Sequence, residues 1–272
     1  MPYPALRLSP NTRTVGPSLS AIAAGATSTQ NKVNTFFMSS DSPGKDTVLA
    51  TENVGKQVSS PEGSLTILSD VSFTVSRGDS VAIVGPSGAG KSTLLALLAG
   101  LDLPTSGRIW LDGRELSALD EDGRAALRAE SVGFVFQSFH LVPSLNALEN
   151  VMLPLELAGA AAPRQQALDI LGTVGLAERT RHYPSQLSGG EKQRVAIARA
   201  FATEPAVLFA DEPTGNLDAR TGENIMRIMF ELNQNSSTTL VLVTHDQGLA
   251  DRCDREIRLD AGKLVSATGA AA

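Results

Sequence analysis

The sequence predicts an α/β fold with two additions, a set of antiparallel strands before the core and a block of helices inserted into it. Three observations lead to this prediction. Short apolar runs alternate with helical segments in the final third of the chain, which is typical of a parallel sheet. Apolar and polar residues alternate between residues 65 and 82, as in half-buried antiparallel strands. Residues 144–180 have a mainly helical pattern, punctuated by prolines.

Composition limits the classes of protein to consider. The chain has 272 residues, of which 42% are hydrophobic, enough for one large domain. Its net charge of -6 gives no reason to expect nucleic acid as a partner. No run approaches the roughly 18 apolar residues of a membrane-spanning helix. The single cysteine, Cys253, excludes an internal disulfide and is expected to be a small buried apolar residue.

The N-terminal part of the chain has a different composition. We predict a disordered extension over residues 1–45, followed by one folded domain over residues 46–272. Residues 1–37 contain three basic residues but no acidic residue, and are rich in Ser, Thr and Ala. The same composition is typical of an organelle transit peptide. A third interpretation, which we favour, is that Met38 is the true start of the protein.

Before the helical block, each element is assigned from its local pattern. The runs at 65–68 and 71–75 predict strands, and a turn at 76–79 follows. Trp110 is expected to pack on the strand in which it lies. In chain order, the next predicted elements are a strand at 81–84, a helix beginning near residue 91, a strand at 106–113 that ends in an Asp-Gly hairpin turn, a helix at 116–129 and a buried strand at 132–136.

After the helical block, placed at about residues 139–190, the pattern returns to strands and helices. A helix is predicted to begin at Ser188 and to end before Pro205. The remaining predicted elements are a strand at 206–210, a helix at 221–233, a strand at 239–243 and a hairpin at 257–265.

The most specific motif follows the predicted strand at 81–84. It has the spacing G-x-x-x-x-G-K-S of the phosphate-binding P-loop. Its glycines let backbone N–H groups curl around phosphate oxygens, and the next helix directs its positive end at the same place. Lys91 is expected at the β- and γ-phosphates, and the Ser92 hydroxyl on Mg²⁺. The predicted phosphate-binding residues are Gly85, Pro86, Ser87, Gly88, Ala89, Gly90, Lys91, Ser92 and Thr93.

Two carboxylates follow the apolar run that begins at Val207. Parallel sheets place ligands at the C-terminal ends of their strands, which is where Asp211 and Glu212 fall. With Ser92, Asp211 would complete the shell of a Mg²⁺ ion, and Glu212 would orient and polarise an attacking water. The pair therefore supports the nucleotide site that the P-loop predicts.

A second helix end also suits a phosphate group. Ser188 and Glu191 have the spacing of a capping box, and Gly189 and Gly190 leave the backbone N–H groups accessible. One nucleotide needs one P-loop, so a second phosphate-seeking end is explained if two copies of the chain meet head to tail. We therefore predict a homodimer around two nucleotides, with these four residues on the partner's γ-phosphate.

Three more polar residues are assigned to the site from their positions. His245 follows the strand at 239–243 and is expected at the γ-phosphate. Gln137 ends its strand and is interpreted as a sensor of the γ-phosphate or water and as a Mg²⁺ ligand. Asp218 lies just past the carboxylates and would couple the two halves of the dimer. The two other histidines, His140 and His182, are expected to be surface or packing residues.

Together, five segments resemble the nucleotide-binding subunit of an ATP-binding cassette (ABC) transporter, and they occur in that family's order. The resemblance covers about residues 50–268, and LSGGE with a P-loop is highly specific to the family. The segments are GPSGAGKST at 85–93, Phe136-Gln137, LSGGEKQR at 187–194, VLFADEPTGNLD at 207–218 and VTHD at 243–246.

The resemblance implies a P-loop NTPase (RecA-like) core with an antiparallel β subdomain and an inserted α-helical subdomain. It also implies that the protein is an ATPase that uses ATP and Mg²⁺. Glu212 would be the catalytic carboxylate and His245 the switch histidine. Gln137 would link hydrolysis to a transmembrane permease, so that the protein would be cytoplasmic and peripheral on the inner face of the plasma membrane.

Within the family, the sequence is most similar to the lipoprotein-release and macrolide-export (LolD/MacB-like) branch, and closest to YbbA-type ATPases. That branch implies a permease partner similar to FtsX or MacB and a hydrophobic or lipidated cargo. One position departs from the family pattern: Val58 stands where an aromatic residue usually stacks on adenine, which leaves the selectivity for adenine open.

Two alternative functions remain open at the level of sequence. The first is a soluble ABC ATPase that acts on nucleic acid or ribosomes. The acidic balance, the single cassette and the short segment between Gln137 and Ser188 argue against it. The second is a regulatory or structural adaptor at a membrane complex, which needs the same nucleotide site. Cargo, direction of transport and the identity of the permease are not encoded in this chain.

Overall fold

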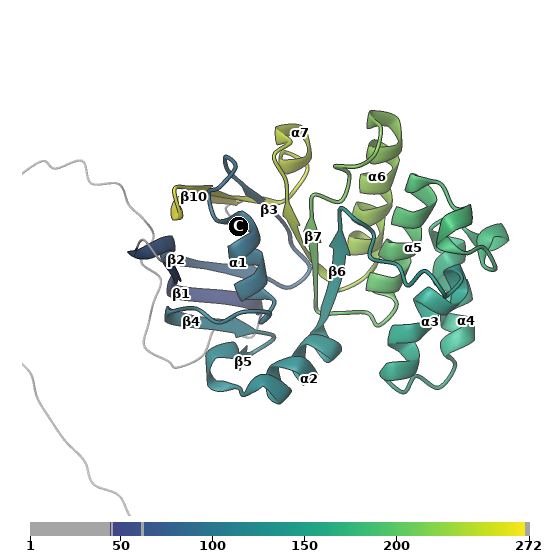
Figure 1. Cartoon of the computed structure of the whole chain (residues 1–272), viewed down its shortest axis with the longest axis horizontal. Coiled ribbons are helices and arrows are strands. Elements are labelled where there is room, and N and C mark those ends of the chain that lie inside the picture. The colour runs from purple at the N-terminus through teal and green to yellow at the C-terminus, as the bar shows by residue number, and fades with distance from the viewer. Residues whose placement is uncertain (1–43, 45, 61–62, 270–272) are drawn as a thin grey trace, which may run out of the picture. The chain divides into compact units, whose positions relative to one another are not determined.

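The structure is a computed structural model, and it describes residues 44, 46–60 and 63–269 (Figure 1). The predicted extension over residues 1–45, which includes the proposed start at Met38, lies outside the described residues except for Gly44. None of the described helices is both long enough and apolar enough to cross a membrane.

A six-stranded sheet forms the centre of the fold, in the order β10-β9-β3-β8-β7-β6. Its strands pair in parallel except for β10, which is antiparallel to β9. The strands are β3 (Ser80–Val84), β6 (Val132–Phe136), β7 (Val207–Asp211), β8 (Thr239–Val243), β9 (Arg255–Asp260) and β10 (Lys263–Gly269).

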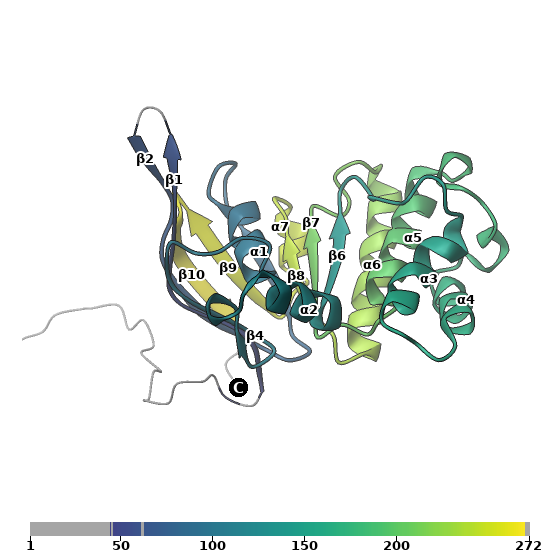
Figure 2. The same ribbon diagram turned by 60° about the horizontal axis from the view of Figure 1, so that its bottom comes forward.

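Apolar side chains cover both faces of this sheet, which explains why its strands are continuous apolar runs. Along β7, Phe209 contributes to a core shared with α1 and the second sheet, whereas Leu208 and Ala210 pack toward the helices on the other face. Figure 2 shows α1 on one side of β6 and β7, and α5 and α6 on the other.

A second, antiparallel sheet has the order β2-β1-β4-β5. The sequence pattern missed β1, and it divided β2 into two strands. Both errors arise from irregular pairing: the β1–β2 register shifts at several points, and Asn53 and Asp70 have positive φ angles of 48° and 53°. These shifts break the alternation of apolar and polar residues. The strands are β1 (Thr47–Ser60), β2 (Gly63–Ser76), β4 (Ser106–Leu111) and β5 (Arg114–Glu115).

The helices include the predicted block between β6 and β7, in which α3 and α4 pack beside α5 (Figures 1 and 2). The helix predicted at 116–129 is instead a 3₁₀ turn and a separate helix, because Asp120 caps the second of them. The α-helices are α1 (Lys91–Leu98), α2 (Glu121–Ser131), α3 (Ala147–Leu157), α4 (Pro163–Thr173), α5 (Gly189–Phe201), α6 (Ala219–Asn235) and α7 (Gln247–Ala250); the 3₁₀ helices are η1 (Leu116–Ala118), η2 (Ala177–Arg179) and η3 (Pro184–Gln186).

This architecture confirms the predicted fold class, a mainly parallel core with an antiparallel sheet and inserted helices. Trp110 is buried, as expected, and stacks beneath the guanidinium of Arg108 at 5.0 Å. Cys253 is only half-buried, but it packs against both neighbouring apolar clusters, and its burial raises the pKa of its thiol to about 12.

A capping box fixes the beginning of α5, as the sequence predicts. The Ser188 N–H donates to Glu191 Oε2 at 2.9 Å, and the Glu191 N–H donates to Ser188 Oγ at 3.3 Å. Arg179 Nε donates to the other carboxylate oxygen at 3.0 Å. The bonds to Ser188, aided by Arg179, lower the pKa of Glu191 to about 2.

Replacing Glu191 should therefore change stability in a pH-dependent way. Because the pKa of Glu191 is lower in the folded state than in the unfolded chain, its contribution is complete above about pH 4.5 and is lost as the pH falls toward 2. We expect Glu191→Ala to lower the free energy of unfolding by about 1 kcal/mol at pH 7. Glu191→Gln, which retains the shape of the cap, should lose less. Urea unfolding at several pH values measures both losses. If Glu191→Ala lowers the free energy of unfolding by as much at pH 3 as at pH 7, the ionised Glu191 carboxylate is not what stabilises the cap.

Candidate active site

The strand register brings the C-terminal ends of four strands to one edge of the sheet. Phe136 is paired with Asp211, Asp211 with Val243, and Val243 with Ile83. A hollow of about 400 Å³ opens at this edge. Two larger hollows, of about 730 and 580 Å³, lie elsewhere, the larger at the opposite edge of the sheet, and neither contains the predicted residues. The hollow of about 400 Å³ is lined by Ser87, Gly88, Lys91, Ser92, Phe136, Gln137, Ser138, His140, Asp211, Glu212 and Val243.

The P-loop connects β3 to α1 and has the conformation that its glycines permit. Gly85, Gly88 and Gly90 have φ angles of 155°, 81° and 95°. A Cβ atom at Gly85 would lie 2.2 Å from the Leu259 carbonyl oxygen, and one at Gly90 would lie 2.7 Å from Leu68 Cδ2. No side chain caps the first turn of α1 in the structure, so its N–H groups are accessible to an anion.

The lysine and serine of the loop have different contacts. Lys91 Nζ donates to the carbonyl oxygens of Gly85 and Pro86, at 2.8 and 3.0 Å. The ammonium group is thereby held across the mouth of the loop, where phosphate oxygens would replace the carbonyls. Ser92 Oγ lies 3.4 Å from Asp211 Oδ2, so the sheet and the helix bring a hydroxyl and a carboxylate together.

The electrostatics of Asp211 favour a bound cation. Burial raises the pKa of this carboxyl, and the neighbouring charge of Glu212 raises it further. The Ser92 hydrogen bond and the Lys91 charge offset only part of this effect. A negative charge that the protein itself stabilises poorly is stabilised by a metal ion.

Magnesium suits the donor set. Among the described residues there is no cluster of three or more His, Cys, Asp or Glu side chains that would form a complete metal cage. Mg²⁺ does not need one, because it is usually held by one or two protein oxygens together with waters and substrate phosphates. The Ser92 hydroxyl and the Asp211 carboxylate are oxygen donors of this kind, 3.4 Å apart at the end of the P-loop.

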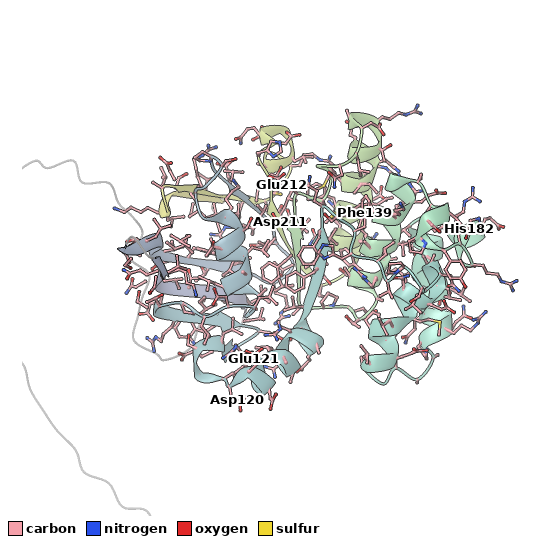
Figure 3. The ribbon with its side chains drawn as sticks, in the orientation of Figure 1. Asp120, Glu121, Phe139, His182, Asp211 and Glu212 are labelled. Carbon is pink, nitrogen blue, oxygen red and sulfur yellow. The ribbon has the colours of Figure 1, made fainter. Side chains whose placement is uncertain are left out.

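Glu212 and His245 form a pair at the ends of β7 and β8. Glu212 Oε1 lies 3.0 Å from His245 Nδ1. The imidazole is 72% exposed and the carboxylate 30%. Glu212 also has a positive φ angle of 44°. Figure 3 shows Asp211 and Glu212 together at this edge, above the strands.

Gln137 faces the hollow but is bonded to the loop that follows Glu212. Its Nε2 donates to Asn216 Oδ1 at 3.1 Å, and Asn216 Nδ2 donates back to the Gln137 carbonyl at 3.0 Å. In the same loop, Asp218 caps α6, accepting a hydrogen bond from the Thr221 N–H at 3.0 Å. Hydrogen bonds to Thr221 lower the pKa of Asp218.

The α5 N-terminus, residues Ser188 to Glu191, does not line the hollow. Instead its glycines pack against the end of the loop before α6 and the first turn of that helix. A Cβ atom at Gly189 would lie 3.3 Å from Leu217, and one at Gly190 would lie 2.6 Å from Thr221. Within one chain, therefore, the P-loop lines the hollow and the N-terminus of α5 does not.

The structure also locates the two other histidines and Val58. His140 stacks on Phe136, with ring centroids 4.7 Å apart, as a packing residue does, but it also lines the hollow. His182 is half-buried and lies 3.4 Å from an Arg179 nitrogen. Val58 lies at the outer end of β1, 37% exposed and opposite Leu65, so the hairpin presents an aliphatic surface there.

Two polar residues inside α5 were missed by the sequence reasoning. Gln193 Nε2 donates to the Pro213 carbonyl at 2.7 Å, and the largely buried Arg199 donates to the carbonyls of Phe139 and His140, at 3.1 and 2.6 Å. Gln193 lies one turn before the buried Ile197, and Arg199 lies one turn after the buried Val195, so each interrupts an apolar face of α5. A polar residue on an apolar stripe was the available signal.

Comparisons with known proteins show the family of the chain. Residues 68–215 match the family described as "ABC transporter". The chain is 54% identical over 221 residues to the uncharacterized ABC transporter ATP-binding protein YbbA of Escherichia coli strain K12, covering 80% of this chain and 97% of that protein. It is 50% identical over 222 residues to the lipoprotein-releasing system ATP-binding protein LolD of Pseudomonas syringae pv. tomato, covering 81% and 98%.

A solved structure is similar over the same region. It is the ATP-binding cassette MJ0796 as a dimer bound to ADP and Pi in a post-hydrolysis state, with a TM-score of 0.75 and 40% sequence identity. The match covers 82% of this chain and 99% of that one. The fold, the arrangement of its motifs and these relatives lead to one conclusion: the chain belongs to the ABC transporter family, as an ATP-binding subunit with ATPase activity.

Proposed function

We propose that two copies of the chain close head to tail around two ATP molecules and that their hydrolysis drives a membrane permease. The observation that supports this arrangement is that the two predicted phosphate-binding segments, the P-loop and the N-terminus of α5, do not line the same hollow. The P-loop faces the hollow, but the α5 N-terminus does not. A second copy would supply the missing end, and the similar cassette MJ0796 is itself dimeric.

The proposed reaction assigns a role to each group at the sheet edge. The P-loop N–H groups and Lys91 would hold the β- and γ-phosphates, and Ser92, Asp211 and Gln137 would hold a Mg²⁺ ion that neutralises part of the phosphate charge. A water oxygen bonds to the γ-phosphorus as the bond to the β–γ bridging oxygen breaks, and the water proton passes to the Glu212 carboxylate. His245, whose Nδ1 lies 3.0 Å from Glu212 Oε1, would contact the γ-phosphate beside that carboxylate.

The partner is proposed from the relatives. LolD is named as part of a lipoprotein-releasing system, and we propose a permease similar to FtsX or MacB that moves a hydrophobic or lipidated cargo. The protein would then be cytoplasmic and held at the inner face of the plasma membrane by that permease. Gln137, joined to the loop that carries Asp218, would report the state of the nucleotide to the permease.

Glu212→Gln should separate binding from hydrolysis. The amide keeps the shape of the side chain and a hydrogen bond to His245, but it cannot accept the water proton. We expect ATP turnover to fall by about 10²–10⁴-fold, while the ATP-dependent rise in melting temperature is kept. Phosphate release and thermal unfolding measure the two properties. Near-normal turnover would contradict the assignment of Glu212 as the catalytic carboxylate.

Asp211→Asn should have opposite effects on the free protein and on its complex. Because the folded-state pKa of Asp211 is raised, its ionisation destabilises the fold as pH rises above about 3.8, and Asn removes that cost. At pH 7 we expect the ligand-free variant to be at least as stable as the wild type. The wild type should gain about 2.7 kcal/mol at a MgATP concentration of 100 Kd, and the variant should gain no more than it does with ATP and EDTA.

Asp112→Asn is the matched control. Burial raises the pKa of Asp112, but hydrogen bonds from Arg77 and Ser131 outweigh it and lower the pKa overall. This variant should be less stable than the wild type at pH 7 and should keep its response to Mg²⁺. Urea unfolding with and without MgATP tests both variants, and a destabilised ligand-free Asp211→Asn would contradict the electrostatic argument.

The permease is tested by affinity purification of the tagged chain, residues 38–272, from gently solubilised membranes of the native organism. We expect a multi-pass membrane protein with a large extracytoplasmic domain to co-purify. Recovery of ribosomes or nucleic-acid enzymes alone would contradict the proposal and favour a soluble ABC ATPase.

A further inference from the structure

We propose that Gln193 is a positioning residue that holds Glu212 in its reactive place and joins it to the α5 N-terminus of the same chain. The inference rests on the catalytic role proposed for Glu212. It concerns a side chain that does not line the hollow and that is fully buried inside α5.

The backbone at Glu212 requires support. Its φ of 44° lies in the left-handed region, which few residues other than glycine adopt without strain. The next residue, Pro213, restricts the backbone of Glu212 further. Two backbone hydrogen bonds help to hold the turn: the Glu212 N–H donates to the Val243 carbonyl, and the Gly215 N–H donates to the Glu212 carbonyl, both at 3.0 Å.

Gln193 supplies the side-chain contact to this turn. Its Nε2 donates to the Pro213 carbonyl at 2.7 Å, and both residues are buried. The carbonyl fixes the orientation of the amide, because a flipped amide would place two oxygen atoms together. Gln193 Oε1 has no hydrogen-bond partner among the described residues. A buried amide oxygen without a hydrogen bond lowers stability. The amide thus makes its hydrogen bond to Pro213 at a position where its oxygen is left unpaired.

The same helix begins at the surface that would meet the partner's nucleotide. Gly189 packs against Leu217, in the loop that follows Glu212, and Gly190 packs against Thr221, in the first turn of α6. Four residues after Gly189, on the next turn of α5, Gln193 bonds to Pro213. The first turns of α5 and the loop after Glu212 are thus in continuous contact. A shift of α5 when it binds one ATP would move the carboxylate that acts on the other ATP.

Asn233 shows what a purely structural buried amide does in this protein. It lies on α6, is 5% exposed, and its Nδ2 donates to the Thr238 carbonyl at 2.6 Å and to the Gly78 carbonyl at 3.3 Å. These contacts are at the opposite edge of the sheet from Glu212. Asn233→Leu therefore removes another buried amide donor without touching the site, and it is the matched control.

The test compares Gln193→Met with Asn233→Leu in the full chain. Both should lower the melting temperature. Only Gln193→Met should reduce kcat, by about 10²-fold, as expected when a catalytic group is displaced by about 1 Å. Its KM and Kd for ATP should stay within about twofold of the wild type, and the cooperativity of turnover with ATP concentration should be lost. If both variants lose kcat in proportion to their stability, the positioning role is overturned.

Two further measurements keep the result decisive. Gln193→Asn, whose amide is too short to reach Pro213 in the same pose, is more conservative; it should show the same selective loss of kcat if Gln193→Met fails to fold. In a Glu212→Gln background, Gln193→Met should cause no additional loss of turnover, because the group that it positions is already absent. Normal turnover by Glu212→Gln alone would reject the catalytic role proposed for Glu212, whereas additive losses would reject only the role of Gln193.

Discussion

The register of the parallel strands is the constraint on which the rest of the site depends. Pairing of β6, β7, β8 and β3 places Phe136, Asp211, Val243 and the start of the P-loop side by side. A shift of one residue in any of these strands would turn its side chains to the opposite face. Because apolar layers cover both faces of the sheet, such a shift would also expose the core. The same packing that stabilises the fold therefore places the carboxylates beside the phosphate-binding loop.

The helix α5 is the second organising element, because its polar side chains end on the two loops that border the hollow. Gln193 reaches the loop after Glu212, and Arg199 reaches the turn after Gln137. That turn contains two consecutive residues with positive φ, Phe139 and His140. Such a backbone is strained in residues other than glycine, and the buried guanidinium stabilises it through its carbonyl oxygens.

Much of this could be predicted from the sequence. The P-loop, the pair Asp211-Glu212 and the cap at Ser188 each depend on a few adjacent residues, so local spacing was sufficient. The strand β1 was missed because bulges conceal its alternation, and Gln193 because its partner lies 20 residues further along the chain. The pairing of Gln137 with Asn216 joins residues 79 apart. Contacts of this kind are set by tertiary packing and cannot be predicted from the pattern within one segment.

The capping box at Ser188 has a consequence for the energetics of assembly. The end of α5 is already ordered in a single chain, since Glu191 bonds to Ser188 and Arg179 holds the carboxylate. A surface that is preorganised loses little conformational entropy when a second copy arrives. The free energy gained at the nucleotide is then not consumed in folding a loop. In the proposed dimer, that free energy would be available to bring the two subunits together.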